Sequence, residues 1–447
     1  MEALTVLRQE ERANLERDVS KNAEFWSAYF SRFQNTYHWL IRHYLARNNR
    51  EKAFEYAERA RAYEILDLLR RGGKLPAGFE AEPKTLRQIQ AALPNGTFIL
   101  AYTVLEELTY TWIVSRDTFE LLEQNARRAD IGRWTDDVQT AVHDRDRTAL
   151  GIGLTAPYVQ LIEQPLARIR KLSKGATPRL VIVPDGALHG LPFAGLRSLD
   201  QKFLIEEAVI EVHGSATLYT LALERDRLLS TVKPSILLFG NPAFDPMYRL
   251  PQLTRADEEV QQIAGFYGDA TVRTGKAATV AEFWKLVPRH SILHIAAHAV
   301  ASARTPSNSE ILLAKSESDS GSLDAKELLE NYRQFGQTKL VVLSACSSAG
   351  GHRIGPEGVG ALVRPFIAAG VPAVIGSLWD VNDATAERLM VSFHRAYEQG
   401  SDAAAALRTA QLELLRGADP GQSGSVLEWA PFQVIGHGSS PNAPTSN

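Results

Sequence analysis

The sequence predicts an α/β protein whose mostly parallel sheet is covered by helices on both faces. From about residue 233 onward, short apolar segments alternate with amphipathic ones, which is typical of a parallel sheet. Before that region, TFILAYTVLEELTYTWIVSRDTFELLE (residues 97–123) is rich in β-branched and aromatic residues and predicts two or three antiparallel strands. The first 71 residues contain no proline and have apolar residues at helical spacing.

The helical start contains YHWLIRHYLARNNREKAFEYAERARAYEILDLL, which indicates two helices joined by a turn at Asn48 and Asn49. This hairpin resembles one tetratricopeptide-type repeat. A plain helical hairpin packed on the next domain explains the same pattern, and the sequence leaves both interpretations open. The residues that line one face of the second helix are Ala53, Tyr56, Ala57 and Ala60.

The rest of the chain divides into predicted elements after a Gly/Pro-rich linker, GGKLPAGFEAEP, near residue 80. A helical interval is expected at about 131–171, followed by the strand RLVIVPD. The later strands are expected at SILLFG, SILHIAAH, EILLA, TKLVVLSAC, AVIGSLWD and FQVIGHG. Helices are expected near residues 256–267, 280–287, 325–332, 357–369, 384–399 and 403–415.

Composition excludes several classes of function. The net charge is −3 and the pI about 6.4, so no surface for nucleic acid or an anionic membrane is predicted. A single cysteine excludes an intrachain disulfide and a thiolate zinc cluster. The N-terminus lacks the order of a signal peptide, and no apolar run reaches the roughly 18 to 20 residues that span a bilayer. We therefore expect a cytoplasmic protein with a reduced thiol.

Two predicted strands end in residues suited to nucleophilic catalysis. SILHIAAH ends at His298 and TKLVVLSAC ends at Cys346, and ligands of α/β sheets bind at the carboxyl ends of strands. An imidazole can accept the proton of a thiol and so create the reactive thiolate. Small residues follow both, and their amides can face a developing oxyanion. Packing of both side chains in the core is the alternative, and the residues alone leave it open.

The remaining histidines are weaker candidates. His294 lies inside the same predicted strand as His298 and is expected to be a packed neighbour. His352 follows two glycines after Cys346 and is a second-choice base. The chain contains no GxSxG, Walker A, HExxH or CxxC pattern, which removes the common hydrolase, NTPase and zinc-site interpretations.

The segments ILHIAAHA and VVLSACSSAGG resemble the CHAT domain, which belongs with separase among the caspase-like cysteine proteases. In that group the histidine also precedes the cysteine by about 50 residues. Further blocks agree in order, and the resemblance covers about residues 80–440: LVIVPDGALHGLPFAGL, FLIEEAVIEVHGSATLY, LFGNPAF, GVGALVRPFIAAGVPAVIGSLWDVND and WAPFQVIG.

The resemblance implies a caspase-like three-layer sandwich with two halves. Residues 80–230 resemble a degenerate pseudo-protease half, in which His189 is expected to belong to a structural turn. Residues 231–440 resemble the catalytic half. The helical, tetratricopeptide-like segment 1–79 precedes them, and a disordered tail, 441–447, follows.

The resemblance also implies an activity, that of a cysteine endopeptidase. Cys346 is expected to be the nucleophile and His298 the general acid–base, with the backbone amides of Ala299 and Cys346 stabilising the oxyanion. The family usually has glycine where this chain has Ala299. SLWDVNDATAERL resembles a separase segment that binds the substrate side chain, so Asp380 or Asp383 is expected to bind a basic residue. For Asp383, the N-cap of the following helix is the alternative.

The expected chemistry needs no metal or organic cofactor. The expected partners are a protein or peptide substrate and a possible protein partner of the helical N-terminus. A catalytically silent caspase-like scaffold for protein–protein interaction is the alternative function, and a thioester-forming amidase or transferase is a third.

Overall fold

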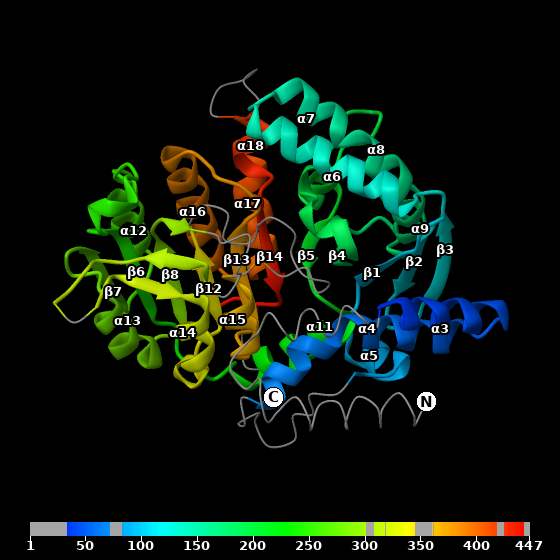
Figure 1. Ribbon diagram of the computed structural model, residues 1–447, viewed down its shortest axis with the longest axis horizontal. Helices are drawn as coiled ribbons and strands as arrows, with labels where there is room; N and C mark the ends of the chain where they lie inside the picture. Colours follow the sequence, from blue (N-terminus) through cyan, green and yellow to red (C-terminus); the bar gives the residue numbers. More distant parts are fainter. Residues whose placement is uncertain are drawn as a thin grey trace.

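The computed structural model describes residues 34–71, 83–300, 308–317, 319–344, 360, 362–417 and 424–441. Within these residues, one 11-stranded sheet runs through the molecule (Figure 1). Its strands, from one edge to the other, are β3 (Phe119–Gln124), β2 (Thr109–Val114), β1 (Thr97–Val104), β4 (Arg179–Val183), β5 (Val209–Val212), β14 (Phe432–Gly436), β13 (Ala373–Ser377), β12 (Leu340–Leu343), β8 (Ile292–Ala296), β6 (Ile236–Pro242) and β7 (Ala270–Gly275).

Most neighbouring strands in this sheet are parallel, as the alternation of strands and helices predicts. β1 pairs antiparallel with β2, and β2 with β3, which confirms the antiparallel strands expected at 97–123. β13 and β14 are also antiparallel. β14 is the last of the described strands along the chain but lies between β5 and β13, so it joins the strands before residue 230 to those after it.

One predicted strand belongs to a different sheet. EILLA was expected in the parallel sheet, but β10 (Glu310–Leu312) pairs antiparallel with β9 (Ala299–Val300) and β11 (Ser322–Asp324). The prediction was wrong because an apolar run of this length fits a small antiparallel sheet equally well. The sequence did not predict β9 or β11, nor two strands of the main sheet, β5 and β7. β7 is half-buried along its length, and β5 has four residues, so neither makes a long apolar run.

Helices cover both faces of the sheet (Figure 1), and alternate residues of each strand pack against them. On β6, Leu238 packs with one layer, while Leu237 and Phe239 pack with the other. The first layer contains α6 (Arg128–His143), α7 (Arg147–Gly153), α9 (Glu163–Leu172), α12 (Ala256–Ala264), α16 (Asp383–Glu398), α17 (Ala403–Arg416) and α18 (Val426–Trp429). The opposite layer contains α5 (Leu86–Ala92), α11 (Ala216–Leu228), α13 (Val280–Leu286), α14 (Ala325–Glu330) and α15 (Arg364–Ala368). This three-layer arrangement confirms the predicted fold.

The helical hairpin at the start consists of α3 (Gln34–Ala46) and α4 (Arg50–Arg71) and packs on the same layer as α5 and α11. Asn48 takes a left-handed φ of 57° in the predicted turn. Ala53, Tyr56 and Ala57 are buried as expected, and the ring of Phe54 lies 5.6 Å from that of Trp112 on β2. The hairpin therefore covers the first strands of the sheet. Residues 1–33 and 72–82 of the expected helical segment and linker fall outside the described residues.

Candidate active site

His298 lies just beyond the carboxyl end of β8, the third strand from the β7 edge of the sheet. Its side chain is 7% exposed, and the ring of Phe244 packs edge-on against it at 5.2 Å. Nε2 lies 2.7 Å from the carbonyl oxygen of Pro251. A carbonyl oxygen only accepts hydrogen bonds, so Nε2 carries the proton and donates it. In the neutral ring, Nδ1 is then an acceptor, which is what a general base requires.

Ala299 begins β9 in the position that the family usually gives to glycine. Leu312 N donates to His298 O at 2.8 Å, and Ala299 pairs with Ile311. In an antiparallel ladder this makes Ala299 and Ile311 a non-hydrogen-bonded pair, so the N–H of Ala299 points away from β10. Ala299 is absent from the described non-glycine residues with positive φ. Its methyl group therefore causes no backbone strain here.

The expected nucleophile follows the neighbouring strand. β12 runs parallel to β8, and its last residue, Leu343, pairs with Ile295. Both strands end at the same edge of the sheet, one before His298 and the other before Cys346. Cys346 and His352 themselves lie outside the described residues, as does the segment 301–307 after His298. The structure therefore describes His298 and the strand that leads to Cys346.

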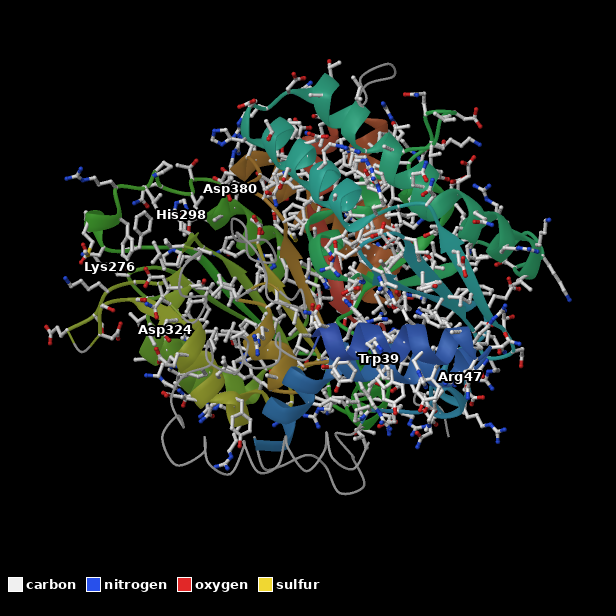
Figure 2. All side chains as sticks on the ribbon, turned by 45° about the vertical axis from the view of Figure 1, so that its right-hand side comes forward. Trp39, Arg47, Lys276, His298, Asp324 and Asp380 are labelled. Atoms are coloured by element: carbon white, nitrogen blue, oxygen red, sulfur yellow. The ribbon has the colours of Figure 1, made fainter. Side chains whose placement is uncertain are left out.

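The two candidate acidic residues differ in their surroundings. Asp380 is exposed beyond the end of β13, and Figure 2 shows it toward the same end of the molecule as His298. Asp383 is the first residue of α16, and its Oδ2 accepts a hydrogen bond from Arg255 N at 2.7 Å. The N-cap of α16 is Asn382, whose side chain accepts from Ala384 N. The N-cap alternative for Asp383 was thus wrong by one position, because Asn382 takes that role.

A cavity lies at this edge of the sheet, against the residues that precede His298 and Cys346. Its described lining includes two acidic residues, Glu259 and Asp383. The Oγ of Ser344 is buried and has no hydrogen-bond partner among the residues that the structure describes. The described residues that line the cavity are Leu253, Ala256, Glu259, Ala296, Ala297, Ser344, Ser377, Val381, Asp383, Ala386 and Phe432.

A buried polar chain behind this cavity was not predicted. His294 Nε2 lies 2.8 Å from Glu259 Oε1, and His294 Nδ1 lies 3.0 Å from His394 Nε2. His394 Nδ1 lies 2.8 Å from the hydroxyl of Tyr267. Burial, together with the neighbouring His294, holds the pKa of His394 well below its usual value. His294 is buried as expected, but it is a polar link between α12 and α16 rather than a simple packed neighbour.

The sequence does contain a signal for Glu259. Ala256, Val260 and Ile263 form the buried stripe of α12, and Glu259 falls on that same stripe. A carboxylate on a buried helix face is rarely present without a partner.

His189 lies in the short 3₁₀ turn Gly186–Gly190, and burial lowers its pKa to about 3. That agrees with the structural turn expected there.

No helix in the described part of the chain is both long and apolar enough to cross a membrane.

The fold is similar to that of a caspase-like cysteine protease. The crystal structure of the Saccharomyces cerevisiae separase–securin complex matches with a TM-score of 0.53 and 10% identity, over 88% of this chain and 34% of that chain. At this identity the match describes the fold alone.

The chain belongs to the CHAT domain family, whose model matches residues 154–437. This confirms the resemblance based on the segments around His298 and Cys346. Tetratricopeptide repeat protein 28 of Mus musculus is 34% identical over 108 residues, which are 24% of this chain and 4% of that protein. The Homo sapiens protein of the same name matches to the same extent. This chain thus spans a small part of the length of these relatives.

Proposed function

We propose that the chain is a cysteine endopeptidase in which Cys346 and His298 cleave a protein substrate. The observation that carries the proposal is the hydrogen bond from His298 Nε2 to the carbonyl of Pro251. It holds a buried imidazole at the carboxyl edge of the sheet with Nδ1 ready to accept a proton. Leu343, the last residue of the adjacent strand, is paired with Ile295, and this register supports a position for Cys346 near that ring.

In the proposed reaction, Nδ1 of His298 takes the proton of the Cys346 thiol, and the sulfur attacks the scissile carbonyl. The amides of Ala299 and Cys346 stabilise the oxyanion of the tetrahedral intermediate. His298 then gives its proton to the leaving amine, and a thioester remains on the sulfur. Water, activated by the same imidazole, hydrolyses the thioester and frees the thiol.

A preference for a basic residue before the scissile bond is part of the proposal. Asp383 supports it, because this acidic residue lines the cavity between α12 and α16. Asp380 is exposed at the same edge and is proposed to contact the substrate from outside the cavity. Carboxylates recognise an arginine side chain through paired, charge-assisted hydrogen bonds.

The test exploits the single cysteine of the chain, since every thiol modification reports Cys346 alone. The rate of alkylation by iodoacetamide is measured against pH for the wild type, His298→Ala and His352→Ala. We expect His298→Ala to lose the fast reaction near neutral pH, because the thiol then lacks its base. His143→Ala, which changes an exposed histidine far from this edge, is the matched control.

The same variants are then compared by mapping new N-termini in a proteome digest, with Cys346→Ala as the inactive reference. Cleavage that disappears in Cys346→Ala and His298→Ala supports the endopeptidase. Alkylation that is unchanged in His298→Ala, together with no cleavage by the wild type, favours the catalytically silent scaffold. Turnover of small amides without protein cleavage indicates the amidase or transferase.

A further inference from the structure

Three segments of the chain connect the lining of the cavity to the proposed catalytic residues. Ala297 lines the cavity and directly precedes His298. Leu253 lines it in the same segment as Pro251, whose carbonyl holds His298. Ser344 lines it at the end of β12, on the way to Cys346. A substrate side chain next to the scissile bond would therefore enter this cavity.

Among the described residues that line the cavity, two are acidic, two are serines and the other seven are apolar. Glu259 and Asp383 contribute carboxylates, and no lysine or arginine lies among the described lining residues. Ala296, Val381 and Phe432 supply apolar walls that suit the methylene groups of a long side chain. Charge and shape together favour a substrate residue with an aliphatic stem and a cationic head.

Glu259 is the more deeply placed of the two carboxylates and is held in position. It is 1% exposed, and its Oε1 is bound by His294 Nε2 at 2.8 Å. His294 is itself fixed by His394, and His394 by Tyr267. Among the described residues, Glu259 Oε2 has no hydrogen-bond partner. One oxygen is thus anchored, and the other remains to accept a hydrogen bond.

We propose that Glu259 is a specificity-determining residue that binds the side chain of an arginine before the scissile bond; this rests on the proposed endopeptidase function. Glu259, Asp383 and Ser344 line one cavity, and each carries a side-chain oxygen that can accept a hydrogen bond. The five N–H donors of a guanidinium suit such a set better than the ammonium of lysine does.

The test compares Glu259→Gln with Glu258→Gln. Glu258 is the neighbouring exposed residue, paired with Arg255 on the other side of α12, and serves as the matched control. Three peptidyl acyloxymethyl ketones with arginine, lysine or norleucine at the reactive position are allowed to alkylate Cys346, and the second-order rates are measured by mass spectrometry. We expect arginine to react fastest in the wild type and in Glu258→Gln.

In Glu259→Gln, we expect the ratio of the arginine rate to the norleucine rate to fall by about 30-fold or more, the usual effect of removing one member of a buried charge pair. The norleucine rate should stay near that of the wild type, which shows that the variant is folded. An unchanged ratio would overturn the proposal. If Glu259→Gln does not fold, Glu259→Asp keeps the charge, and a preference for norleucine in that variant would overturn it as well.

A binding measurement separates this inference from the proposed catalysis. Calorimetry in the Cys346→Ala background uses a peptide that ends in arginine carboxamide and one that ends in norleucine carboxamide. Stronger binding of the arginine peptide, lost in Glu259→Gln, supports the role of Glu259 even if Cys346 never reacts with the ketones. Equal binding of the arginine peptide with and without Glu259→Gln would reject that role even if Cys346 is a nucleophile.

Discussion

Glu211 on β5 and His437, which follows β14, form a buried hydrogen bond of 3.0 Å between Oε1 and Nδ1. Arg179 Nη1 donates to the same oxygen at 2.8 Å. Burial alone would raise the pKa of Glu211, but His437 and Arg179 outweigh it and lower the pKa to about 2. Burial alone would likewise lower the pKa of His437, but the Glu211 carboxylate raises it. These contacts join the two halves of the sheet.

The Glu211–His437 pair predicts that the free energy of unfolding is largest at mildly acidic pH and decreases at both lower and higher pH. The contribution of Glu211 is present above its ordinary pKa of 4.5 and is lost as the pH falls toward about 2. The contribution of His437 is fully present below its ordinary pKa of 6.5 and is lost as the pH rises through its raised, folded-state pKa.

His437→Asn removes a charge-assisted hydrogen bond and should therefore lower the unfolding free energy by about 1.5–3 kcal/mol at pH 5.5, and by less at pH 8.5. Urea unfolding at the two pH values measures this difference. His143→Asn, an exposed substitution, is the control and should follow the wild type. A destabilisation of equal size at both pH values would show that the charge of His437 contributes nothing to the free energy of unfolding.

Ala299 provides a test of the proposed oxyanion site. Proline at this position removes the N–H that points away from β10, and we expect kcat/KM to fall by about 10² to 10³. Ala299→Gly should stay within about threefold of the wild type, because the extended backbone at this position does not require glycine. Steady-state cleavage of a fluorogenic peptide measures both variants. A large gain of activity in Ala299→Gly would contradict the strand conformation described for this residue.

Phe54 provides a test of how the hairpin docks on the sheet. Its side chain is fully buried against the rings of Trp112 and Phe119, so Phe54→Ala should cost about 3–5 kcal/mol. We expect faster hydrogen exchange in α3 and α4 and a lower urea midpoint. Trp39, which is 61% exposed on α3 (Figure 2), is the control, and Trp39→Ala should change stability by about 0.5 kcal/mol or less.

Tyr267 provides a test of the polar chain behind the cavity. Tyr267→Phe removes the partner of His394 Nδ1 and leaves a buried polar atom unpaired, which should cost about 1–3 kcal/mol. The unfolding free energy measures this cost. Phe266→Leu, at a half-buried neighbour without a polar group, is a suitable comparison. Stability equal to that of the wild type would show that Nδ1 finds another partner.

Much of the fold could be predicted because its strands are short apolar runs that end in distinctive residues. β8 and β12 were predicted from such runs, and their shared edge follows from the rules of parallel sheets. β5 could not be found in this way, since it has four residues and carries Glu211, whose partners come from distant parts of the chain.

The candidate site was predicted less completely than the fold. His298 was predicted from its strand and from the family resemblance. Its contact with Pro251 could not be predicted, because that contact depends on how a loop closes over the sheet edge. Glu259 lies on a separate helix, 35 residues before His294 in the chain. Only the packed structure brings that carboxylate into the cavity beside Ala297.

The position of β14 has a consequence for protein synthesis. This strand is the last of the sheet to leave the ribosome, yet it lies between β5 and β13. The nascent chain can fold the strands on either side earlier, but it cannot connect them until residues 432–436 have emerged. Phe432 of the same strand also lines the cavity beside His298. The proposed substrate pocket therefore stays unfinished until these residues emerge from the ribosome.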